Sequence, residues 1–133
     1  LMARTARRAV GGGVFVAGSV GPTGKMVHPL GDISFRGLVE VFKEQIRGLA
    51  AGGADVILAE TQFDLAEARA VVVAAREACD LPVGVSMTFE DGVSLTGTTP
   101  EVFALTSAPT AAPGRSSLSR WPEPCWKFLT CPF

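Results

Sequence analysis

Apolar residues along this chain gather into short unbroken runs, which alternate with helical patterns and turn residues. The runs cover residues 14–17, 55–61 and 82–87, and turn-forming residues such as glycine, aspartate and proline stand beside them. Runs of this length predict strands that are buried on both faces, as in parallel sheets with helices packed outside. The middle run ends in Glu60-Thr61, and the rest of the chain is arranged around this strand.

Helical periodicity fills the intervals between the runs. Residues 37–51 carry apolar side chains at intervals of three and four, which predicts an amphipathic helix. These side chains are Leu38, Val39, Phe42, Ile46 and Leu49. A second helix is predicted from Asp64 to about residue 78, because Glu67 completes a start similar to a capping box. Residues 1–10 also have a helix-forming composition.

A further helix is predicted to open at Thr99, where a hydroxyl N-cap is followed by Pro100 and an acidic residue. After the N-terminal helix, strands and helices then alternate as β-α-β-α-β-α. This alternation predicts an α/β fold with a parallel sheet and right-handed crossovers. Such a segment belongs either to a closed barrel or to a doubly wound sheet.

The composition changes at about residue 107. Proline recurs there among serine, arginine, tryptophan and cysteine, and neither a strand nor a helix pattern fits. We therefore expect a folded part at residues 1–106 and an aberrant tail at residues 107–133, disordered or translated out of frame, with Trp121 and Trp126 unburied. The chain begins with Leu1, from which we expect that a longer reading frame was cut.

Composition narrows the classes of function. The chain has 12 Lys and Arg residues against 13 Asp and Glu residues, so it offers no basic footprint for nucleic acid. No run approaches the roughly 18 apolar residues of a membrane-spanning helix, so no membrane association is expected. Arg7-Arg8 precede a stretch too rich in glycine for an export signal. The cysteines are odd in number and lack metal-site spacing, so a reducing, cytoplasmic setting is expected.

Glu60 is the first candidate for a functional residue, because ligands of parallel α/β folds bind at the carboxyl ends of the strands. By position alone it is either a ligand-binding group or a structural acid. The loop at residues 18–25 approximates a phosphate-binding G-x-x-x-x-G-K-[ST] pattern, but Ser19 and Met26 occupy the required glycine and hydroxyl positions. A tight turn is therefore expected there. His28 stands alone and is expected at the surface.

Four stretches resemble the homocysteine S-methyltransferase domain of cobalamin-dependent methionine synthase. They are Val-Ala-Gly-Ser-Val-Gly-Pro-Thr-Gly at 16–24, Gly-Gly-Ala-Asp-Val-Ile-Leu-Ala-Glu-Thr at 52–61, Val-Ser-Met-Thr-Phe at 85–89 and Leu-Thr-Gly-Thr at 95–98. The resemblance runs from about residue 1 to 105 in order and spacing. It implies a (β/α)₈ TIM barrel of about 250 residues. The three strands here would be its third, fourth and fifth, so the barrel is expected to be incomplete.

The resemblance also implies a chemistry. The family activates the homocysteine thiol on zinc held by three cysteine thiolates, and the thiolate attacks the methyl group of methylcobalamin. The Gly-x-Asn-Cys and Cys-Cys motifs that carry those thiolates do not occur in this chain. Cys79 falls at a helix end, and Cys125 and Cys131 fall in the tail, so we assign no metal ligand and no catalytic residue. We expect this chain to bind neither zinc nor cobalamin.

The resemblance also implies which residues of this chain bind the substrate. Glu60 matches the family's strand-four glutamate, which pairs with the amino group of homocysteine. Ser19, Gly21, Thr23 and Ser86 are expected at strand ends that face the same site, and the capping of a turn is the alternative role for each.

Three functions of different classes fit these observations. The chain is expected to be a fragment of a homocysteine S-methyltransferase that is inactive alone. The alternatives are a non-catalytic folded module that self-associates through open sheet edges, and a truncated product without a function. Within the enzyme class, the alternative is a cobalamin-independent homocysteine methyltransferase that uses S-methylmethionine or betaine.

Overall fold

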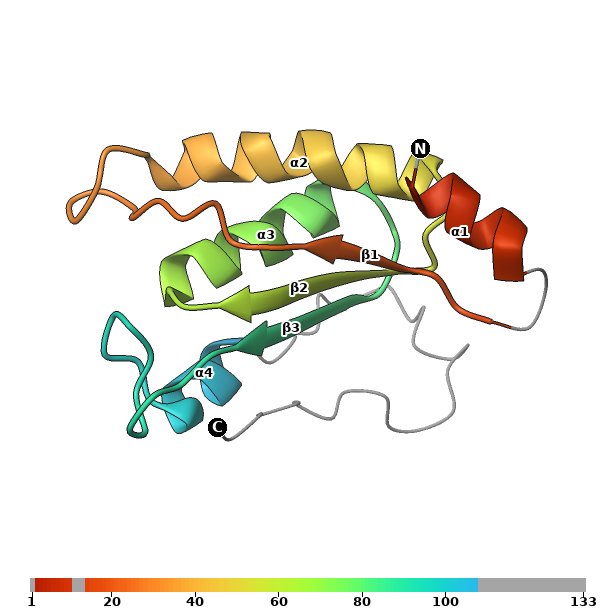
Figure 1. Ribbon diagram of the computed structural model, residues 1–133. Helices are drawn as coiled ribbons and strands as arrows, with labels where there is room; N and C mark the ends of the chain where they lie inside the picture. The colour runs from red at the N-terminus through yellow and green to blue at the C-terminus, as the bar shows by residue number, and fades with distance from the viewer. Residues whose placement is uncertain (1, 11–13, 108–133) are drawn as a thin grey trace.

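The computed structural model describes residues 2–10 and 14–107 (Figure 1). The elements in chain order are α1 (Met2–Val10), β1 (Ala17–Val20), α2 (Phe35–Ala51), β2 (Val56–Gln62), α3 (Leu65–Ala78), β3 (Val83–Met87) and α4 (Pro100–Ser107). The strands form one parallel sheet in the order β1-β2-β3. The predicted α/β class and the parallel order of elements are therefore confirmed.

Except for Ser107, which ends α4, the predicted tail with Trp121, Trp126, Cys125 and Cys131 lies outside the described residues. The boundary at residues 106 and 107 therefore stays a prediction. None of the helices in the described part combines the length and the apolar composition needed to cross a bilayer.

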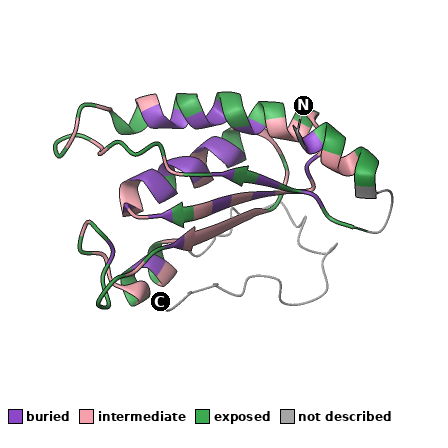
Figure 2. Ribbon diagram, viewed as in Figure 1, coloured by how far each residue is buried: buried purple, intermediate pink, exposed green. Residues whose placement is uncertain are grey.

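Helices α2 and α3 pack against each other and cover one face of the sheet (Figure 1). The core lies between them and the strands, and Figure 2 shows the buried positions gathered there. Its largest fully buried apolar side chains are Phe42, Leu38, Ile46, Ile57, Val20, Val39 and Val71. Burying apolar side chains of this size stabilises the fold by roughly 1.5–3 kcal/mol each. The helix layer is thus the main source of stability among the described residues.

The first strand lies three residues later than the apolar run at 14–17 predicted. Val14 and Phe15 are exposed, whereas β1 pairs with β2 in a register that aligns Gly18 with Ile57. Gly18 explains the shift, because a Cβ at this position would lie 3.1 Å from the Leu49 Cβ. A residue without a side chain therefore lets β1 lie close against α2.

A cluster of polar bonds fixes α1 at the amino ends of the strands. Arg7 forms an ion pair with Asp55 and donates to the Val14 carbonyl oxygen at 3.0 Å. The Asp55 Oδ2 also accepts from the Val16 N–H at 2.7 Å. This backbone bond, together with the Arg7 guanidinium, holds the pKa of Asp55 below its usual value against the opposing effect of burial.

A second polar cluster joins α2 and α3. The Lys43 Nζ lies 2.9 Å from the Glu77 Oε2 and 3.2 Å from the Glu40 Oε1, and Arg36 also pairs with Glu77. The hydrogen bond from Lys43 is the main reason that the pKa of Glu77 is lowered. The bonds to Glu77 and Glu40 raise the pKa of Lys43.

The lowered carboxyl pKa values predict how the protein loses stability in acid. A carboxyl whose pKa is lower in the folded than in the unfolded state stabilises the fold above its unfolded pKa, and this contribution is lost as the pH falls through the folded pKa. The ordinary values are 4.5 for Glu77 and 3.8 for Asp55. We expect the free energy of unfolding, measured by urea titration, to fall as the pH drops below these values. Glu77→Gln should be less stable than wild type at neutral pH and should converge with it in acid.

The matched control is Glu44→Gln, which removes an exposed carboxylate from α2, the helix that packs against α3. Its stability should follow that of the wild type at every pH. A Glu77→Gln curve that stays parallel to the wild-type curve throughout the acid range would contradict the assignment.

Candidate functional site

The carboxyl ends of the three strands meet at one edge of the sheet, and three predicted site residues lie there. Ser19 stands on β1, Glu60 on β2 and Ser86 on β3. The Ser19 hydroxyl donates a hydrogen bond to the Glu60 Oε1. The Ser86 Oγ accepts from the Thr61 N–H at 3.2 Å, next to Glu60. The structure therefore brings these three residues together.

Side-chain alternation along β2 explains which way Glu60 points. Ile57 and Ala59 are fully buried against the helix layer, so Leu58 and Glu60 lie on the opposite face. That face is only partly covered by the described residues, and the Glu60 side chain is half-buried. The prediction that this strand is buried on both faces therefore holds for its helix face alone.

The Glu60 carboxylate lies outside the ion pairs that the described part of the chain forms around Arg7 and Lys43. Among the described residues, no Lys, Arg or His side chain forms an ion pair with Glu60, and its hydrogen bond comes from a neutral hydroxyl. Structural acids are usually paired when they are partly buried. An unpaired carboxylate at a strand end is suited to bind a cationic group of a ligand, such as an ammonium group, by a charge-assisted hydrogen bond.

Two other predicted site residues follow β1. Thr23 is bonded to α3, since its N–H and its hydroxyl both donate to the Glu67 Oε1, at 2.7 and 2.6 Å. Gly21 is exposed, and a Cβ there would meet no atom within 4 Å. Sequence reasoning missed Glu67 as a site residue, although the capping-box pattern did single it out. His28 is exposed, as predicted.

The backbone directly after Glu60 is strained. Thr61 has a φ of 58°, a left-handed conformation that β-branched residues rarely adopt. The pairing of β2 with β3 shifts register between Ala59 and Gln62, so the strained residue lies within an irregular end of the strand. Strain of this kind persists where the surrounding structure enforces it, and it is frequent at binding sites.

The described residues offer no place for the zinc that the family resemblance implies. No group of three or more His, Cys, Asp or Glu side chains among them could hold a metal ion. Cys79 caps the C-terminus of α3, ahead of the amino end of β3, and is partly buried against the core.

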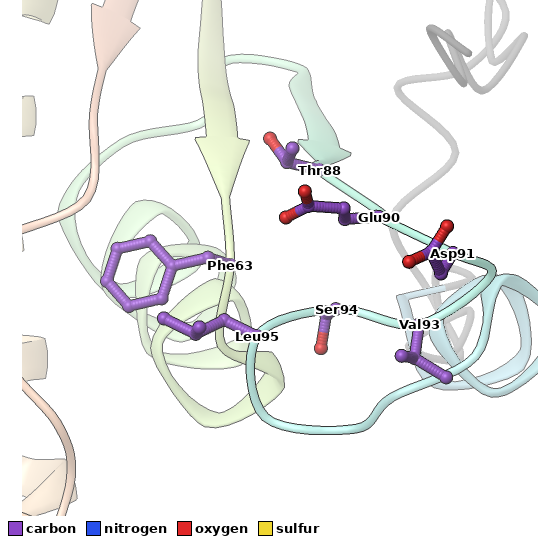
Figure 3. Close-up of a pocket in the computed structure, with 7 residues that line it drawn as sticks. All are labelled: Phe63, Thr88, Glu90, Asp91, Val93, Ser94 and Leu95. Atoms are coloured by element: carbon purple, nitrogen blue, oxygen red, sulfur yellow. The ribbon is translucent and has the colours of Figure 1, made fainter. Parts of the chain in front are cut away.

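A cavity of about 330 Å³ lies at the same end of the sheet as Glu60. Phe63 follows β2, and the other lining residues come from the end of β3 and the loop after it (Figure 3). The lining consists of Phe63, Thr88, Glu90, Asp91, Val93, Ser94 and Leu95. The described lining includes two carboxylates and no basic group, so its electrostatics disfavour an anionic ligand and favour a cation.

Comparison with known proteins assigns the chain to a family. A sequence model of the homocysteine S-methyltransferase family matches residues 1–114, so the chain belongs to that family. In structure it is similar to the homocysteine methyltransferase MmuM from Escherichia coli in its apo form, with 24% sequence identity and a TM-score of 0.62. The match covers 80% of this chain and 39% of that chain. The chain thus spans well under half of that relative, and the similarity confirms the predicted fold of a barrel segment.

The strain at Thr61 predicts an unusual stability effect. Thr61→Gly should raise the free energy of unfolding by about 0.5–1 kcal/mol, because glycine adopts the left-handed conformation without strain. Thr88→Gly is the matched control, since Thr88 is exposed at the end of β3 and has no positive φ. That substitution should lower stability. Urea denaturation of both variants checks the prediction, and a Thr61→Gly protein no more stable than Thr88→Gly would refute it.

Proposed function

We propose that this chain forms the homocysteine-recognising part of a homocysteine S-methyltransferase, with Glu60 pairing with the ammonium group of the substrate. The observation that carries the proposal is the carboxylate of Glu60 at the carboxyl end of the central strand, which forms no ion pair with any residue that the structure describes. Membership of the homocysteine S-methyltransferase family supports it. The Ser19 hydroxyl donates to one oxygen of the carboxylate and fixes its orientation. The other oxygen is then left for the ligand.

The chemical step is proposed for the whole enzyme and not for this chain. Zinc-assisted activation of the thiol needs ligands that the described residues do not supply. The part played here is binding and orientation, which can contribute much of the rate enhancement of a methyl transfer. Alone, the chain should bind homocysteine weakly and transfer no methyl group. A reducing, cytoplasmic setting, which keeps Cys79 as a thiol, belongs to the same proposal.

The identity of the methyl donor is a separate part of the proposal. The resemblance to methionine synthase favours methylcobalamin, bound by another part of the full-length enzyme. The cavity beside Phe63 favours the alternative, a small cationic donor such as S-methylmethionine or betaine. Its two carboxylates, Glu90 and Asp91, and the aromatic ring of Phe63 suit a sulfonium or quaternary ammonium group.

Nuclear magnetic resonance titration of the isotopically labelled chain with L-homocysteine tests the proposal. Amide signals of Ser19, Glu60, Thr61 and Ser86 should shift progressively with ligand concentration, and Glu60→Gln should lose most of these shifts. Losing a charge-assisted hydrogen bond is expected to weaken binding by roughly tenfold or more. The ligand control is N-acetyl-homocysteine, which lacks the ammonium group and should shift nothing. Equal shifts with both ligands, or in both proteins, would refute the role of Glu60.

Self-association through the sheet edges is a further part of the proposal. Strands β1 and β3 each pair with β2 on one side, so within the described sheet their outer edges are unpaired. Unpaired parallel edges favour pairing with another chain. Sedimentation equilibrium should therefore show a dimer at high protein concentration. A wild-type protein that stays monomeric throughout would contradict the expectation.

A further inference from the structure

Glu67 in the first turn of α3 has a fully buried side chain that the proposed function does not use. Its Oε1 accepts two hydrogen bonds from Thr23, one from the backbone N–H and one from the hydroxyl. Its Oε2 is buried without a hydrogen-bond partner among the described atoms. Burying a carboxylate is costly unless its bonds compensate. The two bonds to Thr23 are therefore the principal compensation for burying this group.

These bonds connect the two chain segments that carry Ser19 and Glu60. Thr23 lies in the loop that follows β1, three residues after that strand ends, and Ser19 lies on β1 itself. Glu67 lies in the helix that directly follows β2, which carries Glu60. The Asp64 Oδ2 accepts from the Glu67 N–H at 3.0 Å and fixes the backbone of this turn. The bonds between Thr23 and Glu67 therefore connect these two segments a second time, in addition to the hydrogen bond from Ser19 to Glu60.

The loop at residues 21–25 contains two glycines, so a bond to another element helps to hold it in one conformation. Gly21 and Gly24 flank the anchored residue, and Gly24 adopts a φ of 74°. Glycines give a loop the largest backbone freedom, which must be restricted for the loop to hold one conformation. The Lys25 N–H donates to the Thr23 Oγ1 at 3.3 Å, so the anchored hydroxyl also fixes the following turn.

We propose that Glu67 is a positioning residue, which latches the loop at residues 21–25 onto α3 and thereby holds Ser19 within hydrogen-bonding range of Glu60. Thr23 then acts through Glu67 and not by touching the ligand. The consequence of the latch for homocysteine binding rests on the proposed function. The latch itself does not, because it is a contact between the loop after β1 and helix α3.

Hydrogen exchange at the Thr23 amide tests the latch directly. Glu67→Met keeps the length of the side chain but removes the acceptor, so the Thr23 N–H should exchange about tenfold or more faster than in the wild type. Glu67→Gln keeps an oxygen acceptor and should restore most of the protection. Amides of the core helix α2 should exchange as in the wild type. An unchanged Thr23 exchange rate in Glu67→Met would overturn the latch, whatever the wild type binds.

A double-mutant cycle then separates the latch from direct ligand contact. Glu67→Met should raise the homocysteine dissociation constant about tenfold. Thr23→Val loses the hydroxyl bond but keeps the backbone bond to Glu67, so it should raise the constant less in the wild-type background. In the Glu67→Met background, Thr23→Val should add nothing. In the wild-type background, Thr23→Ser keeps the hydroxyl and should bind homocysteine as the wild type does. An undiminished effect of Thr23→Val in the Glu67→Met background would show direct contact and would overturn the positioning role.

A control must show that Glu67→Met acts through the position of Ser19 and not through a general loss of stability. Glu77→Met is the matched control, because it removes a carboxylate from the same helix but from the cluster around Lys43. It should lower the free energy of unfolding and leave the homocysteine dissociation constant unchanged. An increase in that constant as large as in Glu67→Met would overturn the positioning role. A wild type that shows no homocysteine shifts would refute the proposed function, and Thr23 exchange would still decide the latch.

Discussion

Strand β2 is the element on which the rest of the structure depends, because it is hydrogen-bonded on both sides and its side chains alternate between two unlike faces. One face, with Ile57 and Ala59, is sealed by α2 and α3. The other face carries Glu60. A shift of one residue in register would exchange the two faces and place a carboxylate in the apolar core. The packing that stabilises the sheet therefore also fixes the direction of the candidate binding group.

Charges are distributed so that stability and binding rely on different parts of the molecule. The ion pairs around Glu40, Lys43 and Glu77 lie within α2 or between α2 and α3, and Arg7 pairs with Asp55 at the amino ends of the strands. At the carboxyl ends, Glu60, Glu90 and Asp91 have no such partners within the described part. Carboxylates that lack basic partners attract cations to this end of the sheet. This distribution suits a cationic ligand.

Much of this arrangement was predictable from the sequence. The elements α2, β2 and α3 follow from periodicity and capping, which act over a few residues, and Glu60 follows from its place at a strand end. The position of β1 was not predictable, because Gly18 resembles a loop residue until α2 lies against it. The bond from Glu67 to Thr23 was also missed. A capping box is a local pattern, whereas this contact joins residues that are 44 positions apart.

The open face of the sheet also distinguishes the two fold types that the alternation of elements left possible. A doubly wound sheet covers its second face with helices, which needs large apolar side chains on that face. Here the positions on that face are mostly small or polar. They are Ala17, Ser19, Val56, Leu58, Glu60, Gly84 and Ser86. The Leu58 side chain extends over Gly84, where a Cβ would lie 3.2 Å from its Cδ1. Lateral packing of one large side chain over a glycine suits the interior of a barrel, where side chains of neighbouring strands fill the space in layers and leave polar groups at the carboxyl end.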